Sequence, residues 1–153
     1  EDPRRRQCDI KSTSLLPSIL SQQSAKSNAA DDVIFLRNNL VQESSSSNIF
    51  LVKNNTLITP IANSNILNGI TRQLILKLAQ QNNIASIERD ITENELYTAD
   101  EIFLSSCVKE ITPVIKINET IINQKTQNPL WKIINNLYQN YKQTHTTLAT
   151  IEE

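Results

Sequence analysis

The sequence has few of the residues on which many kinds of functional site depend. Its 153 residues contain one histidine, two cysteines, one glycine and no methionine. A lone histidine, His145 in a polar stretch, argues against a histidine-rich metal site and against a catalytic triad built on histidine. Cys8 and Cys107 are too few for a disulfide framework or a zinc site. We therefore expect no bound metal and a reducing, cytoplasmic setting.

A long apolar run and an excess of one charge are also missing. The formal net charge is −1, which leaves no electrostatic footprint for nucleic acid or for an anionic membrane. No apolar run approaches the roughly 20 residues that a membrane span needs, and no signal peptide is visible. The one basic cluster, residues 4–6, is short and near a terminus, so we interpret it as the solvated end of a strand.

The length suits a single domain, which would bury roughly two-thirds of its unfolded surface. Neither an internal repeat nor a linker divides the chain, since the serine run at 44–47 is too short for a linker. Because the chain begins at Glu1 and contains no methionine, we expect it to be a fragment of a longer protein.

Tight turns are expected to be made by asparagine. Asn38-Asn39 separates the apolar segments 33–36 and 40–41, and Asn54-Asn55 separates 48–52 from 56–59. Asparagine tolerates positive φ, so each pair predicts a tight hairpin without glycine. The two pairs in series predict an antiparallel meander.

Helices are predicted from caps and from apolar spacing. Thr92 and Glu95 have the spacing of a capping box, and Asn128-Pro129 is a suitable cap and first-turn pair. Pro17 is tolerated because it falls in the first turns of its helix. The helix after Pro129 carries apolar residues at intervals of about 3.6. The expected helices are 12–28, 68–80, 92–99 and one from 128 onward, and the further strands are 102–105, 114–117 and 121–122.

This order of short strands and interspersed helices predicts an α/β or α+β fold in one domain. The domain is expected to cover residues 1–143, and residues 144–153 are expected to form a frayed tail.

Three local features are candidates for chemistry, and the first is a lysine. Lys11 lies in the segment 8–12, where a predicted strand meets a helix. Partial burial lowers a lysine pKa from about 10.4 toward neutrality and makes the amine a nucleophile. Taken alone, a surface charge is the simpler interpretation of Lys11.

The second and third features are an acid and the only glycine. Glu43 precedes a hydroxyl-rich bend that leads into an apolar strand, and alone this pattern indicates a polar turn. Gly69 opens a helix together with Ile70 and Thr71. Free N–H groups at a helix N-terminus, beside a threonine hydroxyl, suit a phosphate, and glycine lets a backbone approach closely. A plain helix-start glycine is an equally good interpretation of Gly69 alone.

Taken together, these segments resemble the pyridoxal-phosphate-dependent aminotransferases of class IV (fold type IV), and most of all the D-amino-acid aminotransferases. The resemblance extends from about residue 1 to residue 141. Several blocks in series are far more specific than any one of them. The blocks that match in content, order and spacing are 8–12, 43–48, 66–72, 99–106 and 110–114.

The resemblance implies pyridoxal 5'-phosphate as the cofactor and, for residues 1–143, the large C-terminal domain of the fold, an α/β domain with a barrel-like sheet and flanking helices. Lys11 would be the Schiff-base lysine, which then carries the proton between the substrate Cα and the cofactor C4′. Glu43 would pair with the pyridine nitrogen and keep it protonated, so that the ring accepts the electron pair left at Cα. Leu67 would pack on the ring face, and the helix start with the segment at 106–107 would hold the phosphate. The residues thus assigned to the cofactor are Lys11, Glu43, Leu67, Gly69, Ile70, Thr71, Ser106 and Cys107.

Three positions depart from the family's pattern. Cys107 stands where threonine is usual, and a thiol is a weak donor. Ser44 replaces the usual glycine after the acid, and Ser14 stands where asparagine is common. These departures bear on how tightly the cofactor is held more than on which cofactor it is.

The implied activity is transamination of amino acids, expected to be D-amino acids with a 2-oxo acid as acceptor, in a homodimer. 4-Amino-4-deoxychorismate lyases and branched-chain aminotransferases share the scaffold and stay open as alternatives. Ser14-Leu15 differs from the Asn-Tyr pair that is usual in branched-chain enzymes. A non-catalytic binding or dimerisation remnant is an alternative of another class, and the retention of Lys11, Glu43 and Gly69 argues against it.

The family's N-terminal lobe, which supplies a phosphate-binding arginine and the groups that grip the substrate carboxylate, is absent from this chain. Arg72 and Lys109 lie near the motifs, but Arg72 is expected to point outward along its helix. We therefore expect an incomplete enzyme, which folds, binds pyridoxal phosphate weakly or not at all, and shows negligible transamination.

Overall fold

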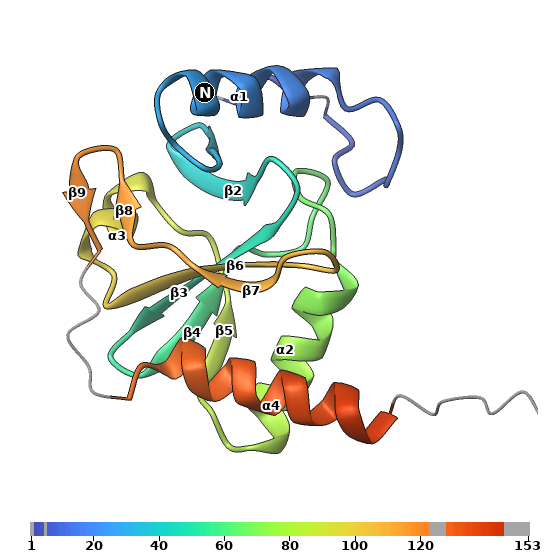
Figure 1. The fold of residues 1–153 in the computed structure, drawn as a ribbon, viewed down its shortest axis with the longest axis vertical. Helices are drawn as coiled ribbons and strands as arrows, with labels where there is room; N and C mark the ends of the chain where they lie inside the picture. The colour runs from blue at the N-terminus through green and yellow to red at the C-terminus, as the bar shows by residue number, and fades with distance from the viewer. Residues whose placement is uncertain (1, 5, 123–127, 146–153) are drawn as a thin grey trace, which may run out of the picture.

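The computed structural model describes residues 2–4, 6–122 and 128–145 of the chain. A mixed sheet lies at the centre of this part of the molecule, with α2 and α4 together on one side (Figure 1). The elements follow one another in the order α1 (Leu16–Ser27), β1 (Ile34–Arg37), β2 (Leu40–Ser44), β3 (Asn48–Lys53), β4 (Thr56–Thr59), α2 (Ile70–Gln81), β5 (Ser86–Glu88), α3 (Glu93–Thr98), β6 (Glu101–Ser106), β7 (Glu110–Pro113), β8 (Lys116–Ile117), β9 (Thr120–Ile121) and α4 (Leu130–His145).

The central sheet has five strands in the order β5-β4-β3-β6-β7. β3 pairs antiparallel with β4 and β6, β6 pairs antiparallel with β7, and β4 pairs parallel with the edge strand β5. Because side chains alternate along a strand, Phe50 packs with α2 and α4, while Ile49 packs with α3 and β2 on the opposite face. The rings of Phe50 and Phe103 stack with their centroids 5.0 Å apart. The α/β fold class predicted from the element order is confirmed.

The asparagine turns are confirmed. Asn38 and Asn39 have φ of 53° and 63° between β1 and β2, and Asn54 and Asn55 have φ of 48° and 59° between β3 and β4. The single meander predicted from them is wrong, since β1 and β2 form a separate two-stranded sheet. The reason is that β3 uses both of its edges for β4 and β6, so no edge is left to pair with β2.

The first helix differs most from its prediction. It begins at Leu16 instead of residue 12, because a longer helix would drive the ring of Pro17 into the carbonyl of Thr13. Lys11, which was expected where a strand meets this helix, lies in a turn-rich segment that is neither strand nor helix. The helix buries only Ala25 and lies beyond β2, away from the central sheet (Figure 1). Its apolar side chains are exposed instead, by 65% at Leu16, 56% at Ile19 and 55% at Leu20, and Leu15 at its N-cap is 50% exposed.

Other element boundaries follow from capping and from edge position. The capping box of Thr92 and Glu95 begins α3 as predicted. The prediction missed β7, whose Pro113 is tolerated because β7 is an edge strand. Thr144 and His145, which were expected in the frayed tail, form the end of α4, and residues 146–153 lie outside the described residues. Within the described ranges, no helix has the length and apolar content to cross a membrane.

The start of α2 depends on a close approach between two segments. Gly69 caps the helix with extended backbone, and a Cβ at this residue would lie 2.4 Å from Oδ1 of Asn48 on β3. Asn48 is itself held in place, because its Nδ2 donates to the Leu67 carbonyl at 2.7 Å. Only glycine fits at position 69 without displacing the side chain of Asn48.

Gly69→Ala should therefore lower the free energy of unfolding by about 1–3 kcal/mol, because the new methyl group overlaps Asn48. Urea unfolding of the wild type and the variant measures the difference. Ile70→Ala is the matched control, since Ile70 is 76% exposed, and it should change stability by no more than about 0.5 kcal/mol. An equal loss for Gly69→Ala in an Asn48→Ala background would show that the overlap with Asn48 is not the cause.

Candidate functional site

A buried carboxylate, that of Glu43, lies at the centre of the predicted set of residues. Glu43 is inside β2, where the sequence had suggested a position after the strand, and it is 7% exposed. Its Oε1 accepts from Nη1 of Arg4. Its Oε2 accepts from the backbone N–H of Leu67 at 3.1 Å and from Nδ2 of Asn48 at 3.2 Å. Glu43 thus joins three segments that are distant in the sequence.

Arg4 is a partner of Glu43, and the interpretation of the cluster at 4–6 as a solvated strand end is wrong for this residue. The side chain of Arg4 is only 9% exposed. Its Nε and Nη2 donate to Asp2 at 2.9 and 2.8 Å, and Nη2 also donates to the Asn65 carbonyl at 3.1 Å. The guanidinium lies 4.5 Å from the centroid of the Phe35 ring. The aromatic face and the acids replace the water that the arginine gives up.

The burial of Glu43 changes its titration. Loss of water around the carboxylate raises the pKa of Glu43 to about 7, although the charge of Arg4 and the N–H of Leu67 act in the opposite direction. The pKa of Arg4 is also raised, because its hydrogen bond to Asp2 and the charges of Glu43 and Asp2 outweigh the effect of its burial. A carboxylate poised near neutrality inside a polar cluster is typical of a functional site.

The start of α2 provides a place for an anion. Gly69 provides no side-chain cap, and the first turn of α2 contains no acidic residue. The partial positive charge at the N-terminus of the helix is therefore not neutralised by the helix itself. Thr71, which is buried, donates from Oγ1 to Sγ of Cys107 at 3.7 Å. This contact brings the helix start and the segment after β6 together, as expected for a phosphate site. Ser106 ends β6 and accepts from the Lys109 N–H at 3.0 Å.

Most of the predicted residues are connected through these contacts. Leu67 is bonded directly to Glu43, and Thr71 directly to Cys107. Asn48 links the two groups, since it binds both Glu43 and Leu67 and lies against Gly69. The side chain of Ile70 is 76% exposed, so only its backbone can contribute to an anion site.

Lys11 is the predicted residue that the structure does not connect to the others. It is exposed, and it makes no hydrogen bond or ion pair with another described residue. Its segment is attached nearby, because the Cys8 N–H donates to the Ser64 carbonyl at 2.7 Å. Arg4 lies seven positions before Lys11 in the same segment, which links this part of the chain to Glu43.

Sequence reasoning missed two residues of this site. Asn48 was inside the matched block at 43–48 but was given no role, and Arg4 was read as solvated. A signal for Arg4 existed, since an arginine two residues after an aspartate can pair with it locally, as Arg4 does with Asp2. Nothing in the local sequence indicates that Glu43 is also within reach.

Arg72 was expected to point outward, and this expectation is wrong. The residue is 1% exposed, and its Nη2 donates to the Pro60 carbonyl at 2.8 Å and to Glu88 at 2.5 Å. Its Nη1 donates to Asn68 at 3.0 Å. Arg72 therefore fastens the loop before α2 to β5.

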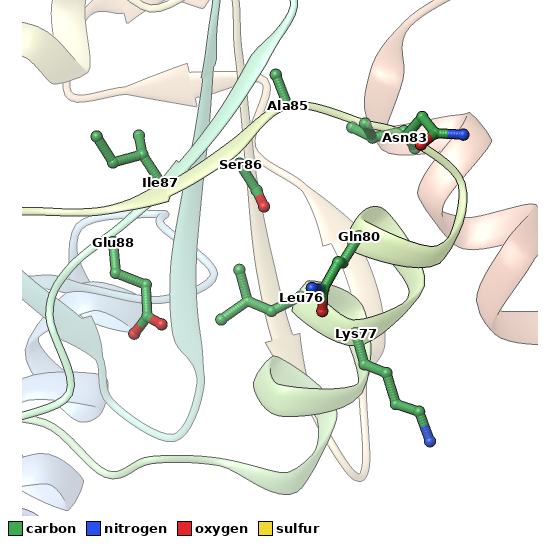
Figure 2. A pocket seen from close by; sticks show the side chains of 9 residues that line it. Leu76, Lys77, Gln80, Asn83, Ala85, Ser86, Ile87 and Glu88 are labelled. Atoms are coloured by element: carbon green, nitrogen blue, oxygen red, sulfur yellow. The ribbon is translucent and has the colours of Figure 1, made fainter.

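A groove of about 870 Å³ lies elsewhere, between the end of α2 and β5. Figure 2 shows Leu76 pointing from the helix toward the strand, and Lys77 pointing away. The groove includes none of the residues predicted for the cofactor, and its charged residues do not converge on one point. We therefore place the candidate site at Glu43 and the start of α2.

Comparison with known proteins agrees with the resemblance. The family model described as amino-transferase class IV matches residues 1–117. D-alanine aminotransferase from Bacillus licheniformis is 37% identical over 140 residues, which are 92% of this chain and 50% of that protein. D-alanine aminotransferase from Listeria innocua is 39% identical over 138 residues, 90% of this chain and 48% of that protein.

Solved structures give the same result for the fold. Branched-chain aminotransferase from Thermobaculum terrenum, solved in its pyridoxal-phosphate form, superposes with a TM-score of 0.83 at 30% identity, over 88% of this chain and 45% of that one. A Legionella pneumophila protein described as a candidate 4-amino-4-deoxychorismate lyase gives a TM-score of 0.79 at 31% identity, over 88% of this chain and 49% of that one.

The large-domain fold expected from the resemblance is thereby confirmed, and the chain spans about half the length of the curated relatives it matches. The matched family model covers residues 1–117, well over half of the chain, and the relatives align with almost all of it. The chain therefore belongs to the class IV aminotransferase family.

Proposed function

We propose that this chain is the cofactor-binding part of a pyridoxal-phosphate-dependent aminotransferase that transfers the amino group of D-amino acids to a 2-oxo acid. The observation that carries the proposal is the connection of buried Glu43 to the start of α2 through Leu67 and Asn48. It holds the carboxylate of Glu43 against Leu67, which precedes Gly69 at the start of α2 by two residues, and so places the carboxylate next to the proposed anion site.

The donor set fits pyridoxal phosphate at both ends of that molecule. The uncapped start of α2, with the hydroxyl of Thr71 beside it, is suited to a phosphate. The carboxylate of Glu43 accepts three hydrogen bonds from described residues, out of about four that its lone pairs allow. One acceptor direction is therefore left for a ring N–H. When bound, the cofactor supplies an acceptor for the electron pair left at the substrate Cα.

The chain's own residues then have separate tasks. Glu43, ionised and oriented, accepts a hydrogen bond from the pyridine nitrogen. Leu67 excludes water from the ring face, and Thr71 with the backbone N–H groups of α2 orients the phosphate. The Lys11 amine would take the proton from the substrate Cα and deliver it to C4′ of the cofactor. The exposure of Lys11 in this chain implies that the remaining half of such an enzyme encloses it.

D-Amino acids are favoured as substrates because several relatives named D-alanine aminotransferase are 37–42% identical over 85–95% of the chain. The lyase reaction is a second candidate, which the Legionella structure supports. The two reactions differ in their need for a second substrate, since transamination consumes a 2-oxo acid and the lyase reaction does not. A 2-oxo acid requirement for turnover in the assembled enzyme therefore separates them.

We further propose that the enzyme acts as a homodimer in the cytoplasm. An interface on this side of the molecule is supported by the exposed apolar side chains of α1 and its N-cap, which are Leu15, Leu16, Ile19 and Leu20. The cofactor-binding domain would cover residues 1–143, and the substrate carboxylate would be held by the family's other lobe.

The first prediction is that Lys11 is the lysine that binds the cofactor covalently. Borohydride reduction of the protein with pyridoxal phosphate, followed by peptide mapping, should place the pyridoxyl group on Lys11. Lys53 is a natural comparison, because its Nζ is engaged by Thr98 and Asp100. Pyridoxal without the phosphate should label lysines without this preference. Label on Lys26 or Lys53 with Lys11 unmodified would refute the assignment.

The second prediction concerns pH. In the folded protein the carboxyl of Glu43 keeps its proton up to about pH 7, compared with 4.5 ordinarily. Between these values the folded state binds more protons than the unfolded state, so the free energy of unfolding falls as the pH rises. Titration of Glu43 should lower the free energy of unfolding by roughly 3 kcal/mol over this pH range.

Urea unfolding between pH 4.5 and 7.5 measures this dependence. Glu43→Gln should remove that part of the slope, while Glu119→Gln should not, since the Glu119 side chain is 97% exposed. A Glu43→Gln variant with the slope of the wild type would contradict the burial effect.

The third prediction is that these 153 residues alone show negligible transamination of D-alanine with 2-oxoglutarate. Catalysis needs the substrate held in a reactive geometry, an effect worth about 7–11 kcal/mol, and a half-site open to water cannot hold it. Pyruvate release measures the rate, with intact D-alanine aminotransferase as the positive control. Turnover within about tenfold of that control would contradict the need for the other lobe.

A further inference from the structure

We propose that Arg4 is a positioning residue, which holds the carboxylate of Glu43 in the orientation that the cofactor's pyridine nitrogen requires. This inference rests on the proposed function of Glu43 and goes beyond it, because it assigns the orientation of that carboxylate to a residue outside the matched blocks.

The guanidinium of Arg4 is fixed from several sides before it reaches Glu43. Nε and Nη2 are committed to the two carboxylate oxygens of Asp2, and Nη2 also to the Asn65 carbonyl. The ring of Phe35 supports one face of the guanidinium at 4.5 Å. A planar guanidinium held at these atoms can aim Nη1 in only one direction, which is toward Oε1 of Glu43.

Each oxygen of Glu43 therefore has a different holder. Oε2 is held by Leu67 and Asn48, and Oε1 by Arg4. With Oε2 alone held, the carboxylate could rotate about the bond to its carbon chain. With both oxygens held the carboxylate cannot rotate, so its remaining acceptor direction is fixed in space. Fixed geometry of this kind is what a hydrogen bond to a ligand needs.

The charges around Glu43 give Arg4 a second role, which is to favour the ionised carboxylate. The charged groups that change the pKa of this carboxylate are Arg4 and Asp2. The thiol of Cys8 lies in the same cluster, and Arg37 forms an ion pair with Asp2 at 3.0 Å. Among them, Arg4 is the cation in contact with Glu43. Without Arg4, burial and the negative charge of Asp2 would favour the protonated carboxyl, which lacks the negative charge that stabilises a protonated ring nitrogen.

Arg37 provides a matched control within the same cluster. Like Arg4, it donates to Asp2, and its Nη1 donates to Oδ1 of Asn65 at 2.6 Å. Its ion pair in the structure is with Asp2, whereas Glu43 pairs with Arg4. Loss of Arg37 thus disturbs the surroundings of Arg4 without removing the bond to Oε1. A purely structural role for Arg4 would make the two substitutions equivalent.

The test uses NMR titration of the Glu43 side-chain carboxyl, labelled with ¹³C, in the cofactor-free protein. Arg4→Met should raise the midpoint by about one to three pH units, because a close opposite charge is lost. Arg37→Met should leave the midpoint near that of the wild type. Arg4→Lys restores the charge without the planar fork, so its midpoint should return most of the way. If Arg4→Met does not fold, Arg4→Lys alone tests the charge effect. A midpoint for Arg4→Lys equal to that of the wild type supports the effect. A midpoint raised by the one to three pH units expected for loss of the charge overturns it.

Binding of pyridoxal phosphate, followed by its absorbance at pH 8, separates this inference from the proposed function. Arg4→Met and Glu43→Gln should each weaken binding about tenfold or more, with Arg37→Met close to the wild type. Equal effects of Arg4→Met and Arg37→Met on both measurements would overturn the role of Arg4 alone. Unchanged binding by Glu43→Gln would instead overturn the proposed function of Glu43, whatever Arg4→Met does.

Discussion

The burial of one carboxylate, that of Glu43, determines how the candidate site is built. A carboxylate removed from water must be compensated by donors or a counter-charge, or it takes up a proton. Here the compensation comes from Arg4 in the N-terminal segment, Asn48 on β3 and Leu67 before α2. The same requirement explains the only glycine, since Asn48 can reach Glu43 and Leu67 only if residue 69 has no Cβ.

The site is therefore a place where strands and the start of a helix meet, more than a cavity. β2, β3 and β6 bring Glu43, Asn48 and Ser106 to it, and α2 begins there. The groove between α2 and β5 includes none of the residues predicted for the cofactor, and its charged residues do not converge on one point. In the function proposed above, this junction would be one half of the cofactor site, and the exposure of Lys11 agrees with a chain that spans about half the length of the relatives it matches.

Local patterns predicted local structure well, and long-range contacts account for the errors. The asparagine pairs and the capping box of Thr92 involve residues no more than three positions apart, so the sequence contains all the information needed. Arg4 was expected to be solvated and Arg72 to point outward, yet Arg4 pairs with Glu43, 39 positions away, and Arg72 pairs with Glu88, 16 positions away. No periodicity or spacing indicates such a pair. The resemblance to a family supplied Cys107, and it gave roles to Glu43 and Thr71, whose local patterns alone also fit a polar turn and a plain helix start.

A direct test of the site is the change in backbone amide ¹H–¹⁵N signals when pyridoxal phosphate is added, compared with pyridoxal and with inorganic phosphate. If the start of α2 holds the phosphate beside Glu43, the amides of Ile70, Thr71 and Cys107 should shift with both phosphate compounds and stay unchanged with pyridoxal. Weak binding is sufficient for this measurement. Shifts confined to the groove between α2 and β5, or equal shifts with pyridoxal, would contradict the site.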